Sequence, residues 1–259
     1  DYSIDWRAVS ASDGHPTNGF LSFGVGDASL PAGVGQTGAA EGNLHAGHSG
    51  ATASAEVFGK TIGDGGAMLA FGLWLFGLLV LRPVRGRVQK GLVLVQVAAM
   101  AVATAGTVLY IVGSLLSLPA TPQGIDVGGF LDGTRIGQLL TARTLLGVAV
   151  TVIGLGLAVR WGDRRALAIS TAMGTGAGGA LVLIALMGHS AAFSPPIPLV
   201  LDIVHLGAAS VWVAGLGALA LLTGLGSGPV RAELREVVPR FSALALLSGG
   251  LRSATGIYA

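Results

Sequence analysis

Six long apolar stretches dominate this chain and limit what it can fold into. Each reaches the roughly 20 residues that a helix needs to cross the hydrocarbon core of a bilayer. Only 11% of the residues are charged, whereas a soluble domain carries about 25%. The sequence therefore predicts an all-α, polytopic membrane helix bundle of about six spans. The stretches cover residues 58–81, 91–118, 137–159, 166–188, 198–223 and 239–259.

The basic residues predict how these spans are oriented. Ten of the 15 Lys and Arg residues lie in or beside every second loop, in "RPVRGRVQK", "RWGDRR" and "PVRAELREVVPR". The alternate loops contain only Arg135 over 119–136 and no basic residue over 189–198. Because basic loops stay in the cytoplasm, we expect the N-terminal segment and these two alternate loops to lie outside.

Residues 1–26 show a different pattern. "DYSIDWRAV" and "GFLSFGVG" alternate apolar and polar residues, as strands do, and "SASDGHPTNG" between them is rich in turn formers. We expect a β-hairpin that is the remnant of a larger domain, because a lone hairpin is marginally stable. Residues 27–56 are rich in Gly, Ala and Ser and predict a flexible linker. Residues 57–259 form the membrane domain, and both ends of the chain are expected to be truncated.

All five histidines are expected on the outer side, and the chain has no cysteine. Metals that accept nitrogen and oxygen ligands, such as Cu(II), Zn or Ni, fit this inventory. Asp13 and His15 flank a glycine in a tight turn and can point at one ion, although a solvated surface turn has the same spacing. His45 and His48 in the linker are weaker candidates, since most linker histidines bind nothing.

A second group lies around the "SPPIP" connection. His189 follows the fourth span, and Asp202 and His205 lie at i and i+3 on one face of the fifth, with Trp212 on the same side. The tight connection predicts that these three ionisable side chains converge, with Met187 as a weaker thioether ligand. An ionisable residue within a span is by default a candidate for function. The alternative is an Asp202–His205 pair that only neutralises itself.

Other charges lie within the spans. Lys60 and Asp64 have the i, i+4 spacing of an interfacial ion pair, and Arg252 interrupts the last span. Arg143 is expected either to reach the outer headgroups or to pair with a carboxylate inside the bundle. We find no P-loop, no HExxH and no nucleophile elbow, so no enzymatic activity is expected.

The motifs resemble those of a known group of copper proteins. "IDWRAVSASDGHPTNGFLSFGVG" resembles the end of the CopC-type periplasmic copper-binding domain, a Greek-key β-barrel. "GHS", "VLDIVHLGAASVWVAGLGALALL" and "RFSALALLSGG" resemble the CopD copper-resistance membrane protein, and fused proteins have this order. The match departs at Ala214, where the helix motif usually has glycine. The resemblance also implies about eight spans in a complete membrane domain.

This resemblance implies that Asp13 and His15 are Cu(II) ligands that need a third ligand from upstream, and that the bundle carries copper inward. His189, Asp202 and His205 would form its entry site. The expected partners are copper, the lipid bilayer and a periplasmic copper chaperone, and no nucleic acid. Two alternatives remain open: an electron-transfer protein with His189 and His205 as axial ligands of one haem, and a non-transporting anchor or assembly partner for a copper-binding domain.

Overall fold

The structure is a computed structural model that describes residues 2–9, 16–23, 50–81, 87–118, 125–161, 165–225 and 228–256. The hairpin expected near the start of the chain is present. Strand β1 (Tyr2–Val9) pairs antiparallel with β2 (Pro16–Phe23), with Tyr2 opposite Phe23. Four predicted metal ligands lie outside the described residues: Asp13, His15, His45 and His48.

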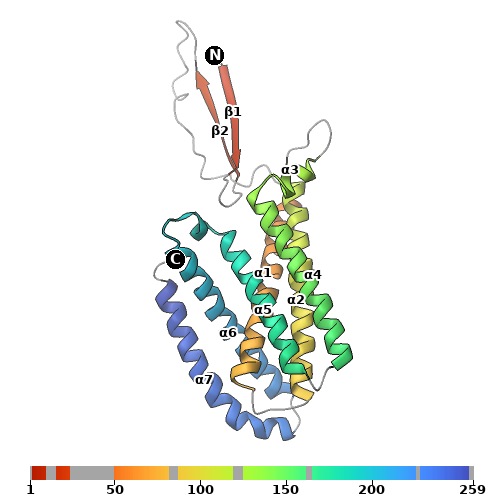
Figure 1. Cartoon of the computed structure of the whole chain (residues 1–259). Helices are drawn as coiled ribbons and strands as arrows, with labels where there is room; N and C mark the ends of the chain where they lie inside the picture. Colours follow the sequence, from red (N-terminus) through yellow and green to blue (C-terminus); the bar gives the residue numbers. More distant parts are fainter. Residues whose placement is uncertain are drawn as a thin grey trace.

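Long helices make up the rest of the described chain (Figure 1). Five of them are long and apolar enough to cross a membrane. The sixth expected span is also a helix, α7, but among the described residues it falls short of this criterion because its first half contains several Arg and Glu residues. The long helices are α1 (Gly50–Leu79), α2 (Arg87–Leu116), α4 (Arg135–Trp161), α5 (Ala166–Leu186), α6 (Ile197–Leu225) and α7 (Gly228–Gly256).

Three local features differ from the sequence predictions. Helix α1 begins at Gly50, inside the segment predicted as linker, since "GATASAE" is rich in alanine, the strongest helix former. A short helix α3 (Val127–Leu131) lies in the loop before α4, and its start is capped by the Asp126 carboxylate, which accepts from the Gly129 N–H at 2.7 Å. A 3₁₀ turn, η1 (His189–Ala192), joins α5 to α6.

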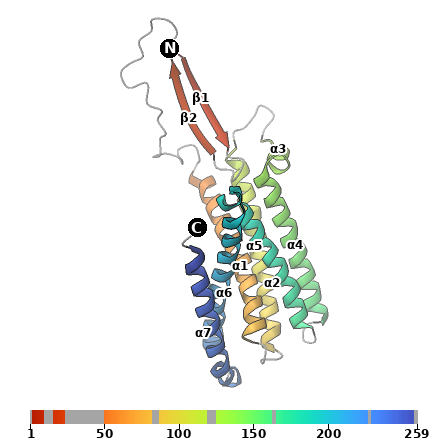
Figure 2. The ribbon, with the colours of Figure 1, turned by 60° about the vertical axis from the view of Figure 1, so that its left-hand side comes forward.

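Helix α1 is the centre of the bundle and packs against α2, α5 and α6. Helices α4 and α7 lie at opposite edges in both views (Figures 1 and 2). Four core side chains of α1 are buried in the second half of the helix, the first two small and the next two large. They are Ala67, Ala70, Leu73 and Phe76.

Glycines allow α1 and α2 to approach closely. A Cβ atom added at Gly66 would lie 2.7 Å from the backbone nitrogen of Ala103, and one added at Gly63 would lie 3.1 Å from that of Thr107. Gly59 and Gly106 have similarly close backbone neighbours across the same contact. Small residues drive helix association in membranes because they bring backbones into van der Waals contact. Helices α1 and α2 are therefore tightly packed.

A buried polar network joins three helices. The Gln96 side chain of α2 donates to the Ala70 carbonyl of α1 at 3.2 Å, and its carbonyl oxygen accepts from the Ser170 hydroxyl of α5 at 2.7 Å. Gln96 and Ser170 are both buried.

Helices α1 and α6 also approach closely. A Cβ atom added at Gly72 of α1 would lie 2.6 Å from the Cβ of Ala214, a buried residue of α6. The alanine in place of the usual glycine is thus accommodated by a glycine on the facing helix.

Candidate metal site at the η1 end of the bundle

The polar candidates lie where α5 ends, η1 follows and α6 begins, which we call the η1 end of the bundle. Asp202, in the second turn of α6, accepts a hydrogen bond at Oδ2 from the Ser190 hydroxyl at 2.9 Å. The same oxygen lies 3.6 Å from where a Cβ on Gly188 would be. Asp202 therefore contacts the loop that carries His189, as the tight connection predicted, through Ser190, a residue that the sequence did not single out.

His205 makes a different contact. Its Nδ1 atom lies 3.0 Å from the Oγ1 of Thr255, a buried residue of α7. The Thr255 hydroxyl donates its only proton to the Leu251 carbonyl at 2.9 Å, with the Arg252 carbonyl at 3.2 Å as a second acceptor. When the hydroxyl donates to a carbonyl it accepts from His205, and in this arrangement Nδ1 carries the imidazole proton. This leaves Nε2 with its lone pair, which is the form of histidine that binds a metal.

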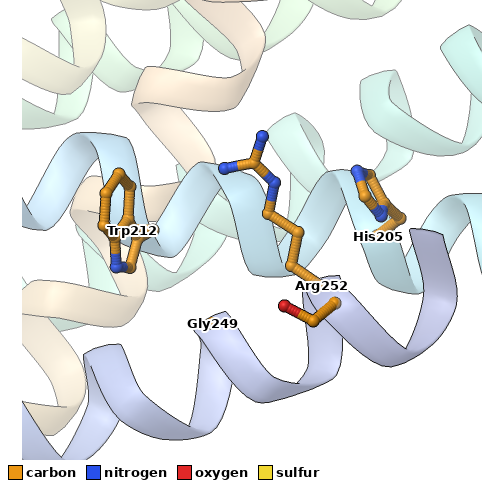
Figure 3. Close-up of a pocket in the computed structure, with 5 residues that line it drawn as sticks. His205, Trp212, Gly249 and Arg252 are labelled. Atoms are coloured by element: carbon orange, nitrogen blue, oxygen red, sulfur yellow. The ribbon is translucent and has the colours of Figure 1, made fainter. Parts of the chain in front are cut away.

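A cavity of about 420 Å³ lies between α6 and α7 beside His205. It is lined by His205, Trp212, Gly249, Arg252 and Ser253. Figure 3 shows the Arg252 side chain, which comes from α7, between His205 and Trp212 of α6. His205 and Trp212 share this cavity, which confirms that they lie on the same side of the helix. No carboxylate among the described residues pairs with Arg252.

The three predicted ligands do not form one compact cluster. Asp202 contacts the η1 loop through Ser190, whereas His205 contacts α7. His189 is exposed at the start of η1, and Met187 is half-buried at the end of α5. In the part of the chain that the structure covers, no three His, Cys, Asp or Glu side chains are close enough together to hold one metal ion. Metal binding at these residues stays a prediction.

The charged residues inside the bundle do not form the pair that their spacing in the sequence predicts. Asp64 of α1 is bound by Arg143 of α4, with Nη1 and Oδ1 2.6 Å apart. The expected Lys60–Asp64 pair is wrong, and Lys60 is exposed. Of the two expectations for Arg143, pairing with a carboxylate inside the bundle is confirmed. The i, i+4 spacing indicated the wrong partner because helix packing brings the buried Arg143 guanidinium to Asp64. A buried charge is more costly to leave unpaired than the charge of the exposed Lys60.

These features define a multi-pass membrane protein with an apolar bundle and polar groups gathered at one end. Residues 51–195, which are 145 of the 259 residues, match the family described as "Copper resistance protein D-like, N-terminal domain". The chain belongs to this family. Neither a curated protein nor a solved structure matches the chain closely enough to add to this assignment. The matched region begins after the hairpin, so the CopC-like nature of residues 1–26 stays a prediction.

Proposed function

We propose that the chain binds copper at the η1 end of its bundle and passes it inward across a bacterial plasma membrane. The observation that carries this proposal is the orientation of His205. The Thr255 hydroxyl holds Nδ1 at 3.0 Å and leaves Nε2 available as a ligand, in a chain that belongs to a copper resistance family. The contact resembles the hydrogen bonds that hold metal-binding histidines elsewhere and raise their basicity.

Asp202 supports the same role. A carboxylate within a hydrophobic span is costly, and such residues usually line ion pathways. Its Oδ1 has no hydrogen-bond partner among the described residues, and Oδ2 is held by Ser190. One carboxylate oxygen at the η1 end is therefore left to receive a cation. We propose that His189, Asp202 and His205 act in sequence along the entry path, with Met187 beside them.

The hairpin supplies the first copper contact in this proposal. Asp13 and His15 would present Cu(II), a metal that suits nitrogen and oxygen ligands, from the extracytoplasmic side, with a periplasmic copper chaperone as the donor. His45 and His48 are weaker ligands in the following segment. Removing Asp13 and His15 should therefore reduce copper capture at low concentration without abolishing passage through the bundle at high concentration.

Copper uptake into proteoliposomes tests the proposal. The wild-type chain should accumulate copper, and His205→Ala should reduce the initial rate strongly because it removes an imidazole ligand. Thr223→Ala is the control, because Thr223 is an exposed residue at the other end of α6 whose hydroxyl binds carbonyls of its own helix, and it should leave the rate nearly unchanged. Wild-type uptake no faster than that of empty vesicles would instead favour the role of an anchor or assembly partner for a copper-binding domain.

The cavity beside His205 favours one other candidate function, electron transfer through a haem. An imidazole, an indole face and an Arg–Ser pair could hold a porphyrin and its propionates. His189 does not line this cavity, which argues against the two-histidine ligation expected from the sequence. Protein purified from haem-supplemented cells should show no Soret band under the copper proposal, and a stoichiometric Soret band lost in His205→Ala would establish the haem function instead.

A further inference from the structure

The Asp64–Arg143 pair lies deep within two spans. Asp64 is ten residues into the span Ser54–Leu79, and Arg143 is eight residues into Arg135–Arg160. At about 1.5 Å per residue these positions are about 15 Å and 12 Å from the starts of the two spans. Taking two charges out of water at this depth costs several kilocalories per mole, and such residues usually have a function in the membrane.

The pair is incomplete as an ion pair. Arginine and carboxylate usually bind through two parallel hydrogen bonds, but one contact, from Nη1 to Oδ1, joins Arg143 to Asp64. The second terminal nitrogen of Arg143, Nη2, is buried and has no hydrogen-bond partner in the described residues. A pair that served only to tie two helices together would be expected to satisfy this donor.

The two partners also differ in access. The Arg143 side chain is 3% exposed and that of Asp64 is 21% exposed. The guanidinium lies against Gly63, where an added Cβ would be 3.2 Å from Nη2. The carboxylate is therefore the more accessible partner of this pair.

Few other titratable groups lie near Asp64. On α1, Glu56 and Lys60 lie two turns and one turn closer to the helix start. Over Gly91–Leu116 of α2 the only titratable side chain is Tyr110, and α5 has none. On α6, Asp202 and His205 lie at the η1 end. A metal ion needs several ligands, which the described residues around Asp64 do not provide, whereas a proton needs one carboxylate oxygen.

We propose that Asp64 is a proton-binding site that drives the copper passage, and that Arg143 is the counter-ion which protonation releases; this coupling rests on the proposed function. Protonated Asp64 leaves the buried guanidinium uncompensated, a costly state. Arg143 then moves toward water and takes α4 with it. Helix α4 is suited to move because it lies at the edge of the bundle (Figures 1 and 2) and packs on α2 and α5 rather than on α1. Of the five candidate spans it also has the smallest buried share, 22%.

Distance measurements between spin labels test this switch without copper. The chain has no cysteine, so labels attach only where cysteines are introduced. Val57 of α1 and Leu145 of α4 are 64% and 65% exposed and tolerate labels. The Val57→Cys/Leu145→Cys distance should shift on acidification by about 2 Å or more, in the range of known helix shifts. The control pair Val57→Cys/Val95→Cys, across the close α1–α2 contact, should not shift.

Variants then assign the shift to Asp64. Asp64→Asn should show the acid distance at every pH, and Asp64→Glu should keep the switch. The double variant Asp64→Asn/Arg143→Gln has no unpaired charge, so it should fold and be insensitive to pH. A wild-type distance that stays constant while the protein remains folded, or a shift that persists in the double variant, would overturn the proposal and leave a static ion pair.

The coupling itself is measured in proteoliposomes with an imposed pH gradient. Acid outside should accelerate wild-type copper uptake, and Asp64→Asn should remove this dependence. Wild-type flux that ignores the pH gradient would contradict the coupling. If the wild type shows no flux at all, the proposed function fails, while the label distances still decide whether Asp64 is a proton switch.

Discussion

His205 of α6 and Thr255 of α7 are 50 residues apart in sequence, yet Nδ1 and Oγ1 lie 3.0 Å apart. When the Thr255 hydroxyl donates to the Leu251 carbonyl, it accepts the Nδ1 proton of the histidine. The contact therefore holds the ring orientation of His205 and favours the tautomer with a free Nε2 lone pair, and it makes α7 part of the candidate metal site.

Replacing Thr255 by valine should weaken copper binding, since it keeps the shape and removes the acceptor. Loss of such a partner typically lowers metal affinity by about 10- to 100-fold. Equilibrium copper titration in an Asp13→Ala/His15→Ala background, which silences the N-terminal pair, measures the effect. Thr255→Ser keeps the hydroxyl and should bind copper as the parent does. Equal affinities in the valine and serine variants would show that the contact has no role in binding.

Replacing Asp202 by asparagine separates its charge from its hydrogen bond. The amide oxygen can still accept from Ser190, so the local structure should persist while the attraction for a cation is lost. Copper affinity should fall clearly more in Asp202→Asn than in Ser190→Ala, which keeps the carboxylate. The same titration compares them, and the reverse order would mean that Asp202 has a structural role.

Gly66→Ala tests the α1–α2 contact. The new Cβ would lie 2.7 Å from backbone atoms of α2, which cannot move aside locally. Overpacking of this kind typically costs about 1–3 kcal/mol, so the midpoint of thermal unfolding in detergent should fall. Gly65→Ala is the matched control, because no atom lies within 4 Å of its added Cβ. An unfolding midpoint for Gly66→Ala equal to that of the control would contradict the close packing.

Gln96→Leu tests the buried network. It leaves the Ser170 hydroxyl without its acceptor, and a buried unsatisfied group costs about 1–3 kcal/mol. Adding Ser170→Ala should recover much of the lost stability, since it removes the orphaned hydroxyl. Thermal unfolding of both single variants and the double variant gives the coupling between the two residues. Strictly additive losses would mean that the two side chains do not interact.

The spans were predictable because their apolar runs are long enough to cross a membrane, and local composition decides this property. Contacts between distant helices were not. Lys60 has the ideal spacing for Asp64, yet Arg143, 79 residues away, is its partner. The choice depends on which helices become neighbours, and a single sequence does not contain that information in a local pattern.

The same reasoning applies to the candidate site. The "SPPIP" connection predicted that the ends of the two helices lie close together, and Asp202 contacts the loop of His189 through Ser190. It did not reveal Ser190 or Thr255, because hydroxyl groups are common in membrane helices and usually bind their own backbone. Thr255 does so as well, and its contact with His205 becomes visible only once α7 is placed beside α6.

X-ray absorption spectroscopy of copper-loaded protein tests the central claim most directly. In the Asp13→Ala/His15→Ala background, with His45 and His48 also replaced by alanine, copper should still bind and its spectrum should show imidazole scattering. Adding His205→Ala should remove at least one imidazole from the copper shell. An unchanged copper environment after this replacement, or no bound copper before it, would contradict a copper site built on His205.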